Sequence, residues 1–377
     1  MLRLRPLARA PLRRYFSASQ MKDEYGAMSD AGDTFEHDGP FTLESGEVLP
    51  HAQLRYNTYG SLNPAGTNVL LVNHALTGNS DLASWWGSML GPTLAFDTDK
   101  YFVVSANILG SCYGSTSPTS VDPSTGEPYG KSFPSVSVRD TVKLQGKLLE
   151  SLGVTSLKSV VGGSFGGMQT LEYLFTGQEF GPETRSAIPI ACGSHHTGWQ
   201  IGISELQRQA IYADPDWAEG EGWNAKKGLE VARQIGMISY RTSQAYEEKF
   251  GRGVQGGKIY GSDAEWDVKS YLEYQGRKFL DRFDPITYVK LTEQMDSHDI
   301  SRGRGEMKAV LNSVKVPTLI VGIDSDVLYP VHEQESLRDG IQGSELVVVN
   351  SDAGHDGFLL EQEEVSKNVI RFLESIE

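Results

Sequence analysis

The chain has 377 residues and a net charge of −15, with 39% hydrophobic and 22% charged residues. This composition is ordinary for a soluble globular chain, and the length suits one large domain with an insertion or two domains. The acidic balance argues against nucleic acid or an anionic membrane as the main partner, and no apolar run is long enough to span a bilayer. The two cysteines, Cys112 and Cys192, form neither a disulfide framework nor a spacing typical of metal ligands. We therefore expect a reduced compartment and no metal site.

The first twenty residues differ from the rest because they contain no acidic residue and five arginines: Arg3, Arg5, Arg9, Arg13 and Arg14. An arginine-rich, acid-free start is typical of a mitochondrial transit peptide. We therefore predict a transit peptide over residues 1–20 and a mitochondrial location. The alternative is a basic tail without targeting function, in which case we expect the cytoplasm. Residues 21–40 are polar and rich in Gly and Asp, which predicts a disordered lead-in.

Apolar periodicity divides the rest of the chain into strands and helices. Two alternating segments about a glycine, 41–47 and 52–59, predict a β-hairpin. Short apolar runs typical of buried parallel strands then occur at 68–73, 101–107, 157–161, 187–191, 317–323 and 345–349. Helical patterns occur at 137–152, 199–212, 331–339 and 358–376. Alternating strands and helices of this kind predict an α/β fold, a mostly parallel sheet with helices on both faces.

One long segment interrupts that alternation. Residues 213–307 are charged, aromatic and helical in pattern, without a convincing strand. Because this segment stands between two strands of the predicted sheet, it would form a helical cap over the sheet's carboxyl edge. The α/β core would then comprise residues 41–212 and 308–377.

The segment Gly162-Gly163-Ser164-Phe165-Gly166 lies where a predicted strand ends and a helix begins. This is the arrangement of a nucleophile elbow, in which a sharp turn exposes the serine hydroxyl and the flanking glycines prevent clashes. With 41 glycines in the chain, such a motif also arises by chance, and the alternative is an ordinary serine in a glycine-rich turn. Its position between strand and helix favours Ser164 as a nucleophile.

A serine nucleophile needs a base and an acid that orients the base, and both must come from loops at the same edge of the sheet. His355 lies in the loop between the last predicted strand and the last helix. The preceding loop offers Asp324 and Asp326, of which we favour Asp326 because it lies further into the loop. The resulting chain order Ser, Asp, His is the one this type of sheet imposes.

Two backbone N–H groups should stabilise an oxyanion at such a site. One belongs to Phe165, directly after the nucleophile, and the other should come from the loop after the 68–73 strand, where we assign Leu76. His74 begins that loop, and we interpret its imidazole as structural.

At this point the sequence resembles the homoserine O-acetyltransferases of the α/β-hydrolase superfamily, a family that includes serine O-acyltransferases. The resemblance extends from about residue 41 to the C-terminus. It rests on seven ordered motifs at 73–78, 109–115, 162–168, 207–211, 232–233, 282–284 and 354–356. It implies the α/β-hydrolase fold and transfer of a short acyl group from acyl-CoA to homoserine, by a ping-pong route through an acyl-serine. Acetyl-CoA would be a co-substrate, with no bound cofactor.

The resemblance also implies roles for particular residues. The nucleophile, acid and base fall on Ser164, Asp326 and His355, and the amino-acid contacts fall on Arg233 and Asp356. An amino acid carries a carboxylate and an ammonium, for which an arginine and an aspartate are suitable partners. The alternatives that stay open are serine as the acceptor, succinyl as the acyl group, and a plain ester hydrolase. The acid loop offers no cation for a succinyl carboxylate, which favours acetyl; a homodimer also stays open.

Overall fold

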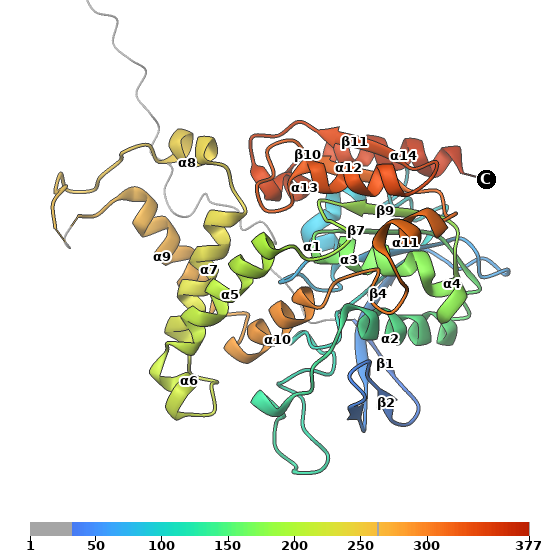
Figure 1. The fold of residues 1–377 in the computed structure, drawn as a ribbon, viewed down its shortest axis with the longest axis horizontal. Helices are drawn as coiled ribbons and strands as arrows, with labels where there is room; N and C mark the ends of the chain where they lie inside the picture. Colours follow the sequence, from blue (N-terminus) through green and yellow to red (C-terminus); the bar gives the residue numbers. More distant parts are fainter. Residues whose placement is uncertain (1–31, 262–263, 377) are drawn as a thin grey trace, which may run out of the picture.

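The computed structural model describes residues 32–261 and 264–376 (Figure 1). Within these residues, nine strands form one sheet in the order β1-β4-β6-β5-β7-β9-β10-β11, with β8 paired to β7. The pairs β1–β4 and β4–β6 are antiparallel and the remaining pairs are parallel. The strands are β1 (Asp33–Glu36), β4 (Gln53–Tyr59), β5 (Val69–Asn73), β6 (Phe102–Ala106), β7 (Ser156–Gly163), β8 (Glu183–Thr184), β9 (Ala187–Ile190), β10 (Leu319–Ile323) and β11 (Glu345–Val349). The predicted mostly parallel sheet is confirmed.

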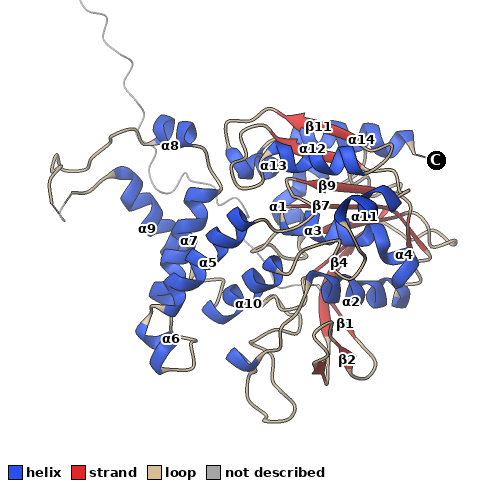
Figure 2. Ribbon diagram, viewed as in Figure 1, coloured by secondary structure: helices blue, strands red, loops and turns tan. Residues whose placement is uncertain are grey.

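Helices cover both faces of this sheet because successive residues of its central strands point to opposite sides. In β5, Leu70 and Val72 pack with residues of α1 (Leu82–Trp86) and α14 (Gln362–Ser375). Val69 and Leu71 pack instead with residues of α2 (Val138–Ser151). The other core helices, drawn in Figure 2, are α3 (Phe165–Glu172), α4 (Thr176–Glu179), α11 (Met307–Ser313), α12 (Val331–Gly340) and α13 (Gly357–Leu360).

The N-terminal predictions need two corrections. The transit peptide and residues 21–31 lie outside the described residues, but 33–36 form strand β1 where we expected disorder. The expected hairpin of 41–47 and 52–59 is also wrong. Instead, β2 (Phe41–Thr42) pairs with β3 (Val48–Leu49), and β4 pairs with β1 and β6. An alternating pattern shows that a strand has one buried face but does not identify the strands beside it. Here the strands beside β4 belong to the main sheet.

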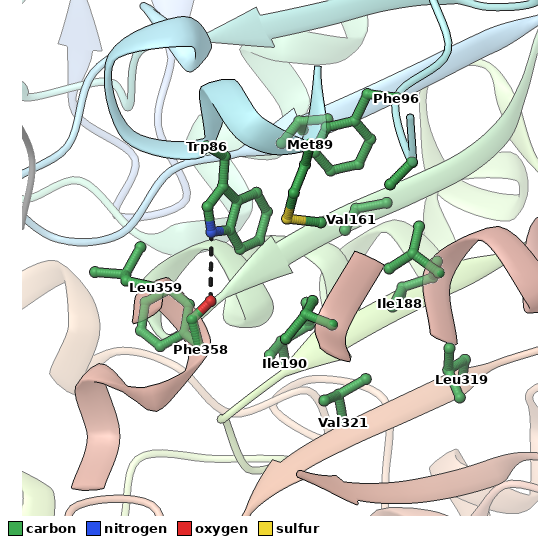
Figure 3. Close-up of a cluster of buried hydrophobic side chains, with 14 of the residues drawn as sticks. Trp86, Met89, Phe96, Val161, Ile188, Ile190, Leu319, Val321, Phe358 and Leu359 are labelled. Carbon is green, nitrogen blue, oxygen red and sulfur yellow. Dashed lines mark hydrogen bonds between the residues drawn. The ribbon is translucent and has the colours of Figure 1, made fainter. Parts of the chain in front are cut away.

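A buried apolar cluster holds the segment after the expected base against the sheet (Figure 3). Trp86 is fully buried, and its Nε1 donates to the carbonyl of Phe358 at 3.3 Å. The Trp86 ring also stacks edge-on against the Phe358 ring, with centroids 6.3 Å apart. Trp86 therefore has a packing role in the core. The contact anchors the start of α13, directly after His355.

The cap consists of α5 (Gly198–Tyr212), α6 (Pro215–Glu219), α7 (Lys226–Ser239), α8 (Ser243–Lys249), α9 (Asp267–Phe279) and α10 (Pro285–Asp296). These helices gather on one side of the sheet, the left side in Figure 1. Because α5 packs on α7 and α10, it belongs to the cap, which therefore begins before the expected residue 213. None of the described helices is long and apolar enough to cross a membrane.

Candidate active site

Ser164 occupies the sharp turn between β7 and α3, with φ 57° and ψ −121°. A positive φ at a residue with a side chain is strained and is typical of a nucleophile elbow. The turn brings backbones so close that only glycine fits beside the serine. A Cβ on Gly162 would lie 2.3 Å from the carbonyl oxygen of Gly166, and a Cβ on Gly166 would lie 2.1 Å from that of Asn73. The glycines thus have the steric reason that the sequence predicts.

His355 and Asp326 form a buried pair. The Nδ1 of His355 lies 2.7 Å from Oδ2 of Asp326. The other carboxylate oxygen, Oδ1, accepts the N–H groups of Leu328 and Tyr329, each at 2.8 Å. Asp326 is therefore held at both oxygens, and its carboxylate orients the imidazole.

The other candidate acid has a different environment. Asp324 accepts the backbone N–H of Ser351 at 2.9 Å and a side-chain N–H of Asn350. These bonds join the two neighbouring loops and use both oxygens of the carboxylate. The preference for Asp326 over Asp324 as the partner of His355 agrees with this geometry.

One pocket brings four of the predicted residues together with the cap. Its space is narrow, about 30 Å³. Ser164, His355, Leu76 and Asp356 contribute to its wall from the core. Residues that the sequence prediction did not include complete the lining: His196, Gln200, Ser204, Gln207, Tyr240, Met295, Leu328 and Tyr329 among them. Polar side chains in an otherwise apolar lining, beside a strained serine, suit a small substrate with polar groups.

For part of this lining, the sequence does contain a recognisable pattern: polar residues at helical spacing. Gln200, Ser204 and Gln207 follow one another at intervals of four and three residues, so they share one face of α5. That face is buried against the pocket, although all three side chains are polar. Buried polar residues at helical spacing in a cap are a pattern that sequence alone can reveal.

The backbone N–H groups of Leu76 and Phe165 are both near Ser164. Leu76 lines the pocket, and Phe165 begins α3 directly after the serine. Neither N–H is paired with an acceptor among the described residues. Two such donors beside a serine hydroxyl match the requirement for an oxyanion hole.

His74 has a structural environment, as we interpreted it from the sequence. Its Nε2 accepts the backbone N–H of Ile108 at 3.2 Å, so the ring proton is on Nδ1, which donates to the carbonyl of Ala75 at 2.8 Å. Burial lowers the pKa of His74 to about 4. The imidazole is therefore neutral at physiological pH and holds the Leu76 loop in shape.

Arg233 and Asp356, the expected amino-acid contacts, lie on either side of the cap boundary. Asp356 lines the pocket, and its Oδ2 is 2.6 Å from Nε of Arg241, which lies two residues after the end of α7. Arg233 is buried in α7 with its guanidinium over the Phe279 ring, and it stands outside the lining of the pocket. Burial raises the pKa of the Tyr240 hydroxyl. The Arg233 guanidinium opposes this rise and the Asp356 carboxylate adds to it. Both charges therefore lie near one pocket residue.

No pattern in the sequence indicates the Arg241–Asp356 contact. The two residues are far apart in the chain, and the contact exists because the cap docks on the His355 loop. Two hydrogen bonds complete this docking: Asp356 N–H donates to the Tyr240 carbonyl at 3.1 Å, and Thr242 Oγ1 donates to the Asp352 carbonyl at 2.7 Å.

The fold and this arrangement define a class of protein. Residues 68–362 match the family described as alpha/beta hydrolase fold. A solved esterase, E22, is similar in fold, with a TM-score of 0.82, 24% sequence identity, and coverage of 90% of this chain and 99% of the esterase.

More similar proteins narrow that class. A homoserine O-acetyltransferase of Trichormus variabilis is 47% identical over 342 residues, which cover 89% of this chain and 92% of the relative. The solved homoserine O-acetyltransferase of Staphylococcus aureus is 31% identical, with a TM-score of 0.73 and coverage of 91% of this chain and 95% of the solved chain. The chain belongs to the homoserine O-acetyltransferase family, whose members are acyltransferases with the α/β-hydrolase fold.

Proposed function

We propose that this protein transfers an acetyl group from acetyl-CoA to the hydroxyl of L-homoserine, through an acyl-enzyme on Ser164. The observation that carries the proposal is the strained Ser164 in one pocket with the His355–Asp326 pair, in a chain 47% identical to a named homoserine O-acetyltransferase. The polar side chains in the pocket's largely apolar lining support a small acceptor with polar groups.

In the first half-reaction, His355 takes the proton of Ser164 Oγ while Oγ attacks the thioester carbonyl. The Leu76 and Phe165 amides would stabilise the resulting oxyanion. When the tetrahedral intermediate collapses, the carbon–sulfur bond breaks and His355 returns the proton to the departing thiolate. Because Asp326 occupies Nδ1, the proton transfers involve Nε2 of His355.

In the second half-reaction, the homoserine hydroxyl replaces the serine hydroxyl in the same chemistry. His355 takes the proton of the homoserine hydroxyl, whose oxygen attacks the acyl-serine carbonyl. The bond from that carbonyl to Ser164 Oγ then breaks, and His355 returns the proton to Oγ. One base can serve both steps because each begins and ends with a neutral imidazole.

Arg233 and Asp356 would bind the carboxylate and the ammonium of the acceptor. Asp356 follows the base directly, so an ammonium at its carboxylate would place the rest of the amino acid close to His355. Arg241 neutralises Asp356 in this structure, and an incoming ammonium would share or replace that contact. Arg233 contributes a buried cation that a carboxylate near Tyr240 could reach after a small movement of the cap.

Hydrolysis of the acyl-serine is the competing outcome, since solved esterases share this fold. A transferase must therefore exclude water while the acyl group waits. The narrow pocket and the cap that closes it support this requirement. Serine is the alternative acceptor and succinyl the alternative acyl group. Either would form the same kind of ester bond as homoserine and acetyl do.

The test combines homoserine or serine with acetyl-CoA or succinyl-CoA and identifies the products by mass. We expect O-acetylhomoserine as the main product, and thiol release that depends on homoserine. Thiol release that proceeds equally without any amino acid would identify a hydrolase and overturn the proposal. Ser164→Ala serves as the inactive control.

We also propose a mitochondrial location, supported by the five arginines and the absence of acids in residues 1–20. Import of the full chain into isolated mitochondria tests it. Protection of the imported chain from external protease is the expected result, and equal import of a chain without residues 1–20 would contradict the proposal.

A further inference from the structure

A second histidine–aspartate pair lies near the first, and the histidines of both pairs line the pocket. Nδ1 of His196 lies 2.9 Å from Oδ1 of Asp296, just as His355 pairs with Asp326. His196 and His355 are both buried, and both line the pocket. Nothing in the proposed reaction uses His196 or Asp296, so the second pair needs its own explanation.

Tyr329 joins the two pairs. Its hydroxyl lies 3.0 Å from Nε2 of His196, and its ring lies against that of His355, with centroids 5.1 Å apart. Its backbone N–H donates to Oδ1 of Asp326 at 2.8 Å. Tyr329 therefore contacts both the acid and the base at one end and His196 at the other, and it is 1% exposed.

The second pair is anchored in the cap. Asp296 ends α10, and its Oδ2 lies 2.6 Å from a guanidinium nitrogen of Arg208 in α5. Arg208 is buried and belongs to the motif at 207–211, to which the proposed reaction gives no role. A continuous chain thus connects two cap helices to His355: Arg208, Asp296, His196 and Tyr329. We call these four residues the Tyr329 chain.

The orientation of the His355 ring determines whether its Nε2 faces Ser164. The bond to Asp326 holds one edge of the imidazole, while the Tyr329 ring packs against its face. The hydroxyl bond to His196 restrains rotation of the phenol ring about its side-chain bonds. Loss of that bond would let both rings move. Nε2 of His355 would then face Ser164 for a smaller fraction of the time.

We propose that the Tyr329 chain is a positioning device, through which the docked cap holds the His355 imidazole in line with Ser164. The inference rests on the proposed acyl transfer at Ser164. The four residues act through His355, not on the reacting atoms. Both half-reactions use the same imidazole, so a broken chain should slow both by the same factor and leave the KM for homoserine unchanged.

The test measures two rates in Tyr329→Phe and Asp296→Asn: acylation of Ser164 by p-nitrophenyl acetate in a single turnover, and homoserine-dependent acetyl transfer. Asp296 stands outside the lining of the pocket, so its substitution leaves substrate contacts in place. We expect both rates to fall about ten-fold in each variant, with the homoserine KM within about two-fold of the unmodified protein. The double variant should be no slower than the single variants, because both substitutions break one chain.

Thr292→Val is the matched control. Thr292 is buried in the same helix as Asp296, and its hydroxyl donates to the Val289 carbonyl, three residues earlier, at 2.8 Å. Its rates should stay within about two-fold of the unmodified protein. Acylation rates unchanged in Tyr329→Phe and Asp296→Asn, a loss confined to KM, or additive losses in the double variant would each overturn the proposal. Failure of the acyltransferase proposal is distinguishable, because the unmodified protein would then acylate with the ester but show no homoserine-dependent transfer.

Discussion

At the residue scale, the residues proposed as nucleophile, base and acid could be located from the sequence because each follows a recognisable strand. Ser164, Asp326 and His355 come from separate loops, and a parallel sheet brings the carboxyl ends of its strands to one edge. The sequence could not reveal Arg241 or Tyr329 in the same way. The Arg241–Asp356 contact depends on how the cap docks, and the Tyr329–His355 contact depends on which way the two side chains point. No local pattern encodes either.

Asp326 and Asp324 allow a matched test of the acid's role. We expect Asp326→Asn to lower kcat by about 10³- to 10⁴-fold, because an amide cannot both hold the imidazole tautomer and stabilise its charged form. Asp324→Asn should change kcat by less than about five-fold, since its bonds only join two loops. Steady-state kinetics of acetyl transfer measure both. Equal losses in the two variants would contradict the assignment of Asp326.

Arg233→Ala tests the acceptor site. Loss of the carboxylate partner should raise the homoserine KM by at least about ten-fold, because charge-assisted hydrogen bonds contribute about 1.5–3 kcal/mol. Acylation by p-nitrophenyl acetate should change little, since that ester carries no carboxylate. Arg277→Ala is the control, because Arg277 lies on the cap surface with 59% of its side chain exposed. An unchanged homoserine KM in Arg233→Ala would remove Arg233 from the site.

Gly166 and Gly202 give opposite predictions for one added methyl group. Gly166→Ala would place Cβ 2.1 Å from the Asn73 carbonyl oxygen, and we expect a loss of more than about 3 kcal/mol in unfolding free energy. Gly202 lies on the exposed face of α5 with nothing within 4 Å of its Cβ position. Gly202→Ala should therefore stabilise the protein by up to about 1 kcal/mol. Denaturant titration measures both, and a neutral Gly166→Ala would contradict the close approach at the elbow.

At the scale of elements, periodicity predicted the buried parallel strands well, because strands buried on both faces form short continuous apolar runs. It failed for β4, whose alternation suits a strand of a separate hairpin and a strand within the main sheet equally. It also placed the start of the cap too late. The apolar positions of α5 pack against α7 and α10 instead of the sheet, and a helical pattern alone does not identify the partner of its buried face.

A buried charge cluster joins the core to the segment that follows the cap. Glu172, at the end of α3, pairs with Arg304 at 2.8 Å and with Arg139 of α2 at 3.4 Å, and is 1% exposed. Glu172→Gln would leave two arginines with fewer partners, so we expect a loss of about 2 kcal/mol in unfolding free energy. Glu150→Gln breaks an exposed pair with Lys147 and should cost less than about 0.5 kcal/mol. Equal losses in denaturant titration would contradict the structural role of the cluster.

At the scale of the whole molecule, buried neutral histidines predict a dependence of stability on pH. Burial lowers the pKa of His74 to about 4 and that of His298 to about 3. In the unfolded chain both histidines titrate near pH 6.5. As pH falls below 6.5, the unfolded state therefore binds protons that the folded state does not, and the unfolding free energy decreases down to the folded pKa values.

We expect each of these histidines to contribute about 2 kcal/mol to the loss of stability between pH 7 and pH 5. His74→Gln should reduce this pH dependence by about that amount, even if the variant is less stable at pH 7. His51→Gln, at an exposed position, should leave it unchanged. Denaturant titrations at the two pH values give the result. Identical pH dependence in His74→Gln and the unmodified protein would contradict a neutral buried His74.

The central claim is that Ser164 carries the acetyl group between donor and acceptor. Intact-protein mass spectrometry after mixing with acetyl-CoA alone tests it most directly. We predict that the protein gains the mass of one acetyl group, that peptide mapping places it on Ser164, and that homoserine removes it with formation of O-acetylhomoserine. An unmodified Ser164 in a protein that still forms O-acetylhomoserine would contradict the account.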